Sequence, residues 1–341
     1  MKTIAMCALL AALAFGLLPG NRDEAAASDA GLVLLVETGE EAVAPRKALS
    51  AQQNESEATM TQTAPDAQTV RLLDDGAVAE LSMEDYLTGV LLSEMSADFE
   101  TEARKAQAVA ARTFTCRKLL QPKHENADVC AEASCCQAWT SREQLRQKYG
   151  ASFDAVWSAA REAVRQTAGE VLTYDGQLID AVYFSCSGGA TEAAVAVWGT
   201  DVPYLQAVES PGEEAAPRFS SRAVFSPEEF SQRLMQENSD VQLNGSPDTW
   251  LGETTRSAGG GAATCSIGGV SFSGTQLRRM FGLNSTRLTL SYQDGDFVFD
   301  VTGFGHRVGM SQYGAQTMAQ LGFSYRTILQ YYYQGAEVER Q

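Results

Sequence analysis

Two clusters of reactive side chains stand out in this sequence, and each contains one of its two histidines. The first cluster runs from His124 through Cys130 to the adjacent pair Cys135 and Cys136. Four nitrogen and sulfur donors within 13 residues can bind one Zn²⁺ tetrahedrally, although this spacing is not that of a standard zinc finger. The same cysteines can instead form disulfides beside a bystander histidine, and the pattern leaves both interpretations open.

The second histidine, His306, lies in the segment GFGHRVGMSQYGAQTMA. Four glycines within twelve residues (303, 305, 309 and 314) predict an unusual backbone path around it. We expect His306 and Gln312 to face a ligand in a groove. The alternative is that His306 packs the C-terminal helix against the core.

A carboxylate and two cations form a third candidate site. Glu94 ends a predicted apolar helix, and Lys105 and Arg112, seven residues apart, lie on one face of the next helix. Apolar surroundings raise the pKa of a carboxyl group and suit it to general acid catalysis, whereas nearby cations oppose that rise. The alternative is that Glu94 belongs to a structural salt bridge.

The segment YFSCSGGATE places a loop rich in Ser and Gly after a strand. Such a loop brings backbone N–H groups close to a ligand, and an ordinary tight turn is the competing interpretation. The candidate ligand contacts are Tyr183, Ser187, Gly188 and Thr191.

The elements that must position these residues are a mixture of helices and short strands. Ser82 is a good helix N-cap, and the turns at Asp74-Asp75-Gly76 and Asp175-Gly176 predict hairpins. The pattern is typical of an α+β fold with packed helices and antiparallel or mixed sheets. We expect hairpin strands at 70–73 and 77–81, helices at 82–94, from about 101 through 120, 137–166 with a break at 149–150, 227–236 and 311–333, and strand pairs in 265–274 and 287–301.

Composition and charge bound the rest of the chain. A formal charge of −17 over 341 residues argues against nucleic-acid binding, which usually needs a basic patch. Lys2 followed by an apolar run at 4–20 predicts a membrane anchor over residues 1–20, and a cleaved secretion signal is the alternative. Residues 21–68 are acidic and low in complexity, which is typical of a flexible stalk, and 69–341 form the predicted catalytic domain. The expected location is the cell membrane, with a single span and an extracytoplasmic domain, or secretion if the segment is cleaved.

Taken in order, the blocks EDYLTGVLLSEM, KAQAVAARTF, H…DVC…CQAW, SGGATE…WGTDVPYL and GFGHRVGMSQYGAQTMA resemble the SpoIID family of stage II sporulation proteins. The resemblance covers about residues 70–336. It implies a lytic transglycosylase of the bacterial cell wall that cleaves between N-acetylmuramic acid and N-acetylglucosamine and favours strands stripped of stem peptides. It also implies a role in engulfment of the forespore, with a cell-wall amidase and membrane proteins of the engulfment machinery as partners.

The resemblance implies specific roles for residues in this chain. Glu94 matches the family's catalytic acid, and Lys105 and Arg112 match its important basic residues. His124, Cys130 and Cys136 match its structural zinc site, with Cys135 standing where a histidine is usual. Arg307 is a second departure, because the family usually has glycine there, and it puts a tight turn after His306 in doubt.

The mechanism that this implies uses one carboxyl group. Protonated Glu94 donates to the glycosidic oxygen, and its carboxylate then takes the proton of the muramyl 6-hydroxyl as a 1,6-anhydro ring closes. A non-catalytic glycan-binding scaffold that holds or activates an amidase is the alternative function. A zinc peptidase fits poorly, since four protein ligands close the metal site and no HExxH motif is present. Cys116, Cys186 and Cys265 receive no role.

Overall fold

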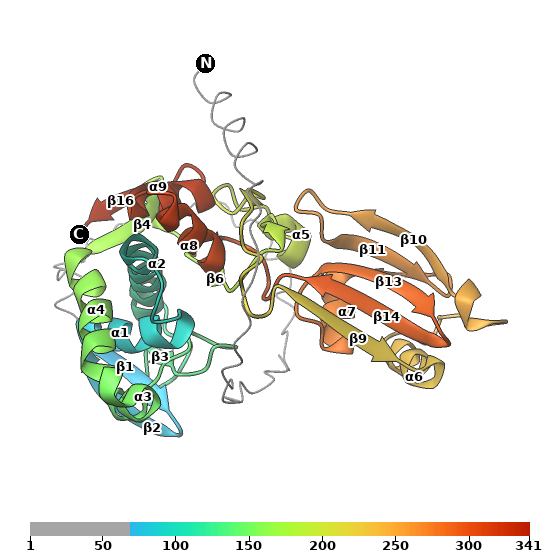
Figure 1. The fold of residues 1–341 in the computed structure, drawn as a ribbon, viewed down its shortest axis with the longest axis horizontal. Helices are drawn as coiled ribbons and strands as arrows, with labels where there is room; N and C mark the ends of the chain where they lie inside the picture. Colours follow the sequence, from blue (N-terminus) through green and yellow to red (C-terminus); the bar gives the residue numbers. More distant parts are fainter. Residues whose placement is uncertain (1–68) are drawn as a thin grey trace, which may run out of the picture. The chain divides into compact units, whose positions relative to one another are not determined.

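The computed structural model describes residues 69–341, so the predicted anchor at 1–20 and stalk at 21–68 lie outside the described residues. Helices and small sheets alternate along this region, which confirms the α+β fold (Figure 1). Within it, no helix is both long enough and apolar enough to cross a membrane. Two separate clusters of buried apolar side chains form its interior.

The first cluster begins with the predicted hairpin of β1 (Thr69–Asp74) and β2 (Ala77–Ser82), which pair in antiparallel register. Asp75 and Gly76 both adopt positive φ, at 46° and 79°, as a tight two-residue hairpin turn requires. β3 (Val129–Cys130) adds a parallel strand beside β1. This strand carries the second residue of the histidine–cysteine cluster into the core.

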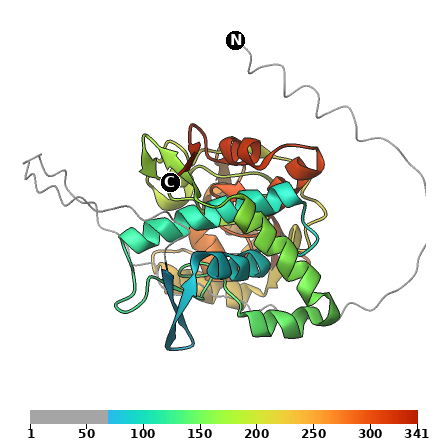
Figure 2. The ribbon, with the colours of Figure 1, turned by 90° about the vertical axis from the view of Figure 1, so that its left-hand side faces the viewer.

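Helices α1 (Met83–Glu94) and α2 (Thr101–Leu120) follow where the sequence predicts them. The Ser82 hydroxyl accepts the Asp85 N–H at 3.1 Å, which satisfies one free donor of the first turn of α1. Both helices contact α4 (Phe153–Gln166), which crosses them in Figure 2. α2 buries a row of alanines, and their small side chains allow this close approach.

The predicted helix over 137–166 begins later than expected. α3 (Arg142–Tyr149) starts at a capping box on Ser141, and the predicted break falls at Gly150, where φ is +52°. The 3₁₀ turn η2 (Gly150–Ser152) leads into α4. Residues 137–140 are not helical, and their backbone is free to reach the end of α1.

The C-terminal part of the chain returns to the first cluster. β4 (Glu170–Tyr174) lies between β5 (Gln177–Leu178) and β16 (Glu337–Arg340). The predicted helix over 311–333 is two helices, α8 (Gln312–Gln320) and α9 (Tyr325–Tyr332), because Gly322 between them adopts a φ of +87°. Short parallel pairing of β6 (Tyr183–Phe184) with β15 (Met310–Ser311) brings Tyr183 and the start of α8 together.

The second cluster is built from the segment between these elements. Two three-stranded sheets and two helices enclose a core rich in phenylalanine, with the Phe230 and Phe297 rings stacked at 3.8 Å between centroids. The helix expected over 227–236 and both expected strand pairs are confirmed. The elements are β9 (Ser220–Phe225), α6 (Pro227–Glu237), β10 (Leu251–Arg256), β11 (Ala262–Ile267), β12 (Val270–Ser273), α7 (Gly274–Phe281), β13 (Arg287–Gln293) and β14 (Asp296–Thr302), with the 3₁₀ turn η3 (Pro247–Thr249) before β10.

Candidate active site and metal-binding cluster

Glu94 is held at the C-terminal end of α1 by two other segments. Its Oε1 accepts the backbone N–H of Ala138 at 2.9 Å, and its Oε2 accepts the side-chain amide of Gln312 at 3.3 Å. Gln312 is the first residue of α8, and Ala138 lies in the non-helical stretch before α3. Residues more than 200 positions apart therefore meet at one carboxyl group.

The surroundings of Glu94 favour its neutral form. Burial raises the pKa of Glu94, and the hydrogen bonds from Ala138 and Gln312 lower it without cancelling the rise. Glu94 is thus a carboxyl group whose surroundings favour holding a proton.

Tyr183 binds the same loop that holds this carboxyl group. Burial raises the pKa of Tyr183, and the charge of Glu94 raises it further. The Tyr183 hydroxyl donates to Gln137 Oε1 at 2.8 Å, and the Gln137 amide donates to Tyr86 and Thr115 at 3.2 and 3.0 Å. The sequence analysis did not select Gln137. Its position directly after Cys136 is the one feature of the sequence that could have indicated a role.

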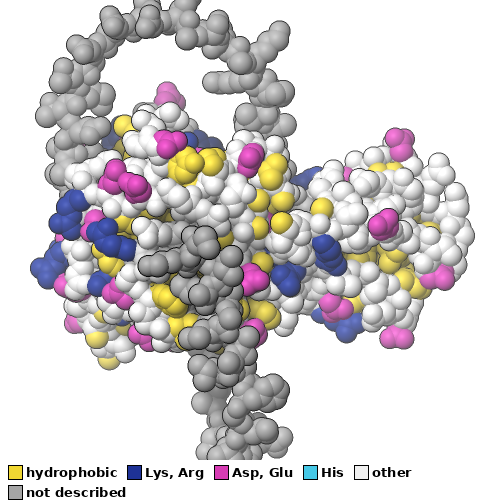
Figure 3. Space-filling model, turned by 90° about the horizontal axis from the view of Figure 1, so that it is seen from above, with side chains coloured by type: hydrophobic (Ala, Val, Ile, Leu, Met, Phe, Trp, Pro, Cys, Tyr) yellow, Lys and Arg dark blue, Asp and Glu magenta, His cyan; other side chains and the backbone are white. Residues whose placement is uncertain are grey.

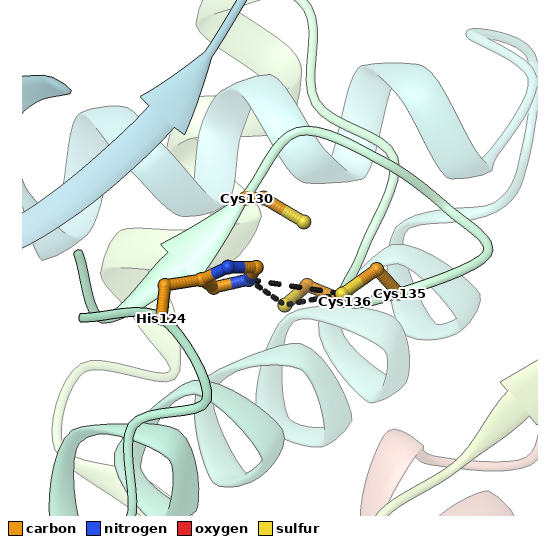
Figure 4. Close-up of side chains that lie close together, drawn as sticks. All are labelled: His124, Cys130, Cys135 and Cys136. Carbon is orange, nitrogen blue, oxygen red and sulfur yellow. Dashed lines mark hydrogen bonds between the residues drawn. The ribbon is translucent and has the colours of Figure 1, made fainter. Parts of the chain in front are cut away.

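The histidine–cysteine cluster forms a compact donor set (Figure 4). One ligand atom from each of His124, Cys130, Cys135 and Cys136 lies within 4.8 Å of all the others. His124 Nε2 is 3.7 Å from Cys135 Sγ and 3.6 Å from Cys136 Sγ, and the two sulfurs are 4.0 Å apart. Zinc bonds of about 2.0–2.3 Å in a tetrahedron require separations of this size, so the donors fit a zinc ion. The described cysteines are free thiols, which goes against the disulfide alternative.

This cluster is joined directly to the carboxyl group. Cys136 is followed by Gln137, which binds Tyr183, and by Ala138, which binds Glu94. The next two residues also contact α1. The Ser93 hydroxyl donates to the Thr140 hydroxyl at 2.7 Å. Trp139 packs against Gly89, where an added Cβ would lie 2.3 Å from the indole nitrogen. The fold of the cysteine loop therefore sets the position of the N–H group that holds Glu94.

The Ser/Gly loop turns its polar groups inward. The carboxylate of Glu213, which is buried, accepts the Ser187 N–H at 2.5 Å, the Ser187 hydroxyl at 2.9 Å and the Gly188 N–H at 3.2 Å. The Thr191 hydroxyl accepts the Val208 N–H at 2.9 Å. The backbone N–H groups of the loop thus bind a carboxylate of the chain itself. We therefore correct Ser187, Gly188 and Thr191 from candidate ligand contacts to structural residues.

His306 is surrounded by protein groups. Its ring lies 5.6 Å from the Phe184 ring and 5.5 Å from the Trp198 ring, and its Nδ1 accepts the Val308 N–H at 3.1 Å. Burial and the charge of Arg278 lower the pKa of His306 to about 4. The ring contacts are to β6 and α5 (Ala194–Trp198) rather than to the C-terminal helix, and His306 is half-buried, so the groove role and the packing role both stay predictions. Trp198 is 45% exposed and is the aromatic side chain here that a ligand can reach.

Comparison with known proteins places this arrangement in a family. Residues 74–174 match the SpoIID family, described as Stage II sporulation protein. Stage II sporulation protein D of Bacillus subtilis (strain 168) is 37% identical over 269 residues, which cover 77% of this chain and 76% of that protein. The protein of the same name from Bacillus amyloliquefaciens is 37% identical over 265 residues, covering 77% and 75%. This chain belongs to the SpoIID family.

A more distant relative carries a different name. The amidase enhancer of Bacillus subtilis (strain 168) is 29% identical over 301 residues, which cover 73% of this chain and 39% of that protein. The chain is therefore a sporulation protein by its family.

The two cations that the SpoIID resemblance assigns to the site have other partners in the structure. Lys105 forms an ion pair with Glu102 at 2.8 Å, and its Nζ is 5.7 Å from the centre of the Tyr325 ring. Arg112 is fully buried and donates to the Val164 carbonyl at 2.9 Å and to the Glu170 carbonyl at 3.3 Å. A glycan cannot reach a fully buried guanidinium, so we correct Arg112 from a substrate contact to a residue that fastens α4 and β4 to α2.

Arg307 resolves the doubt about the turn after His306. Its φ is +68°, so the tight left-handed turn is kept even though glycine is absent. The guanidinium is fully buried, pairs with Glu192 at 3.0 Å, and donates to the carbonyls of Ser187, Ala190 and Gly259 at 2.7 Å each. These bonds compensate for the strained backbone and join three loops.

Replacement of Arg112 tests its structural role. Arg112→Ala leaves buried carbonyl groups without donors, so we expect the free energy of unfolding to fall by about 2–4 kcal/mol. Urea titration followed by circular dichroism measures it. Arg165→Ala, on the exposed face of α4, is the matched control and should change stability by less than about 0.5 kcal/mol. An Arg112→Ala protein of wild-type stability that binds glycan more weakly would restore the substrate role.

Acid titration tests the lowered pKa of His306. A folded-state pKa of about 4, below the ordinary 6.5, means that the unfolded chain binds the proton first. Stability should therefore be lost as the pH falls from about 6.5 toward 4. The melting temperature of His306→Gln should fall less steeply over that window than that of the wild type. Equal slopes for the two proteins would show that His306 is not buried in the neutral form.

Proposed function

We propose that this SpoIID-family protein is a lytic transglycosylase that cleaves peptidoglycan strands between N-acetylmuramic acid and N-acetylglucosamine. The observation that carries the proposal is the carboxyl group of Glu94, which is held by two neutral donors and whose raised pKa keeps a proton available. Hydrolytic glycosidases need two carboxyl groups about 5–9.5 Å apart, one of them to activate water or attack the sugar. The two groups that bind Glu94 are the neutral donors Ala138 and Gln312, an arrangement that suits a reaction in which one carboxyl group is the acid.

The reaction conserves protons and needs no water. Glu94 donates its proton to the glycosidic oxygen as the bond from that oxygen to the muramyl C1 breaks. The muramyl 6-hydroxyl oxygen then bonds to C1, and its proton passes to the Glu94 carboxylate, which restores the acid. The products are a 1,6-anhydromuramyl end and a free N-acetylglucosamine hydroxyl.

The two oxygens of Glu94 differ in their suitability for this task. Oε1 is held by the shorter bond, 2.9 Å from the Ala138 nitrogen, whereas the Gln312 amide is 3.3 Å from Oε2. Oε2 is therefore the oxygen that carries the transferable proton. Two aromatic residues supply contacts for the flanking sugars. Tyr183, whose pKa is raised by burial and by the charge of Glu94, supplies a hydroxyl group. Trp198, which is exposed and lies next to His306, supplies an aromatic face.

Zinc belongs to this proposal as a structural ion. His124, Cys130, Cys135 and Cys136 would hold it, and it would fix the loop that presents Ala138 to Glu94. Four protein ligands leave no open position, so the chemistry rests on Glu94 alone. The membrane anchor, the extracytoplasmic location, the action during engulfment and the engulfment partners remain part of the same proposal.

A second candidate function rests on one comparison. The relative named amidase enhancer supports a scaffold that binds glycan and activates a cell-wall amidase without cleaving it. Product analysis separates the two functions. Mass spectrometry of glycan strands incubated with the purified protein should reveal anhydromuramyl ends if it is an enzyme, and no new ends if it is a scaffold.

The proton donor is tested by Glu94→Gln, which keeps the shape of the side chain and cannot transfer a proton. We expect a folded protein whose release of anhydromuropeptides is lower by a factor on the order of 10² or more. Glu100→Gln, an exposed carboxylate close to it in sequence, is the control and should keep wild-type activity. Near-wild-type turnover by Glu94→Gln would remove Glu94 from the mechanism.

The pH dependence follows from the direction of the pKa shift. Activity requires protonated Glu94, so it should fall as the pH rises through a midpoint above the ordinary 4.5. Gln312→Ala removes a hydrogen bond that lowers this pKa, and the midpoint should move to higher pH. Gln316→Ala, which changes another α8 glutamine, should leave it in place. A midpoint that moves downward in Gln312→Ala would contradict the assigned role.

Metal analysis tests the structural ion. The purified protein should contain about one zinc per chain, and Cys130→Ser should lose the metal together with thermal stability, because binding energy contributes to folding. Cys265→Ser changes a buried thiol of the second cluster and should keep the zinc. Full stability of metal-free Cys130→Ser would mean that the four donors do not form a structural site.

A further inference from the structure

A small open cavity of about 290 Å³ lies in the second cluster, where the loop before β10 meets the turn between β11 and β12. Its volume is close to the lower end of the roughly 300–1,000 Å³ that ligand pockets occupy, which suits one sugar ring. Three glycines and Leu251 form part of its wall. The side chains that can bind a ligand here are those of Gln242, Asn244, Thr249, Trp250 and Ser266.

None of the side chains that line this cavity is charged. Charged residues make up 20% of the chain, and acidic and basic side chains are spread over the face drawn in Figure 3. Amide and hydroxyl groups both donate and accept hydrogen bonds, which matches the hydroxyl and acetamido groups of a neutral sugar. A carboxylate or phosphate would find no cation among these side chains, so the lining favours an uncharged ligand.

Backbone hydrogen bonds hold the walls of the cavity together. The Gln242 N–H donates to the Gly268 carbonyl at 2.9 Å, and the Gly268 N–H donates to the Trp250 carbonyl at 2.8 Å. A Cβ at Gly268 would lie 2.7 Å from the Val241 side chain, so the loop and the turn approach each other too closely for a larger residue. The cavity is therefore formed before a ligand arrives, and binding costs little ordering of the chain.

The groups at the rim are available to a ligand. The Gln242 and Asn244 side chains are exposed, and neither amide has a hydrogen-bond partner among residues 69–341. The Trp250 ring stacks on the buried Phe297 ring, with centroids 5.5 Å apart and planes at 15°. This stacking fixes the indole, so its side toward the cavity offers a rigid apolar surface to the C–H groups of a sugar.

We propose that this cavity is a second carbohydrate site, which binds an N-acetylglucosamine unit of a glycan strand separately from the site at Glu94. The inference rests on the proposed function for its choice of a glycan as ligand. Along such a strand the muramyl sugar carries an acidic or substituted lactyl group, whereas N-acetylglucosamine is neutral and smaller. One weak contact of this kind raises the effective concentration of the strand at Glu94 without taking part in the reaction.

NMR of the tryptophan indole groups tests the site without any cleavage. Protein labelled with ¹⁵N at tryptophan is titrated with a tetramer of N-acetylglucosamine, and Trp250→Phe identifies the Trp250 signal by its loss. We expect the tetramer to shift this signal, with a dissociation constant about tenfold or more higher in Gln242→Ala/Asn244→Ala. Gln232→Ala/Gln236→Ala, which changes two exposed glutamines of α6, is the control and should bind like the wild type.

Three results would overturn the second site. The first is a tetramer that shifts other signals of the protein and leaves that of Trp250 in place. The second is unchanged affinity at Trp250 in a Gln242→Ala/Asn244→Ala protein whose melting temperature shows that it is folded. The third is an equal effect of an acidic tetramer of galacturonic acid, which would mean that the cavity does not select a neutral sugar.

A cleavage assay separates this inference from the proposed function. On long glycan strands, Gln242→Ala/Asn244→Ala should raise the apparent KM severalfold and leave kcat unchanged, because the substitutions weaken binding alone. An unchanged KM in a variant that has lost binding at Trp250 overturns the strand-holding role. A wild-type protein that cleaves no strand while the tetramer still shifts Trp250 overturns the transglycosylase and leaves the second carbohydrate site.

Discussion

The hydrogen bond from the Ala138 N–H to Glu94 is the contact on which the rest of the site depends. It joins the end of α1 to a loop whose other groups are already committed: Cys136 belongs to the donor set for zinc, and Gln137 binds Tyr183. Farther along, Trp139 packs against Gly89. Because each residue of the loop is held by a different partner, the N–H group has little freedom to move. The carboxyl group is positioned by backbone rather than by a flexible cation.

This arrangement lets the pKa of Glu94 stay raised without a basic residue as its hydrogen-bond partner. A cation beside Glu94 would lower its pKa and make it a poorer acid at neutral pH. The structure instead gives Lys105 and Arg112 other partners, the first on Glu102 and the second on buried carbonyls. Desolvation is left as the largest influence on Glu94, and two neutral donors orient it without removing the proton. The donors that orient the carboxyl group of Glu94 are therefore not the cause of its raised pKa, which comes from burial.

Local signals in the sequence predicted the elements well. Ser82 begins α1, Glu94 ends it, and the Asp-Gly pairs form the hairpin turns, because capping and positive φ are decided by a few neighbouring residues. That His124, Cys130, Cys135 and Cys136 lie close together could also be predicted, since they belong to one short segment. The amphipathic patterns likewise gave the mixed α+β class.

Partners that come from distant segments could not be predicted from the sequence. Nothing near Glu213 in the sequence indicates that it accepts hydrogen bonds from the Ser/Gly loop, and nothing near Glu192 indicates that it pairs with Arg307. Those contacts form only when the segments pack. The position of Arg112 was misjudged for the same reason: the seven-residue spacing gives the face of a helix but does not say what covers it. The predicted helix over 137–166 began too early because its first residues bind other parts of the fold.

Direct titration of Glu94 tests the central claim, that one desolvated carboxyl group without a cation is the acid. Carbon NMR of protein labelled at the glutamate carboxyl carbons, with the spectrum of Glu94→Gln subtracted, reports this group alone. The account predicts a pKa above the 4.5 of an ordinary glutamate. A pKa at or below 4.5 would mean that Glu94 is charged and solvated or ion-paired, and that the proton donor is a different group.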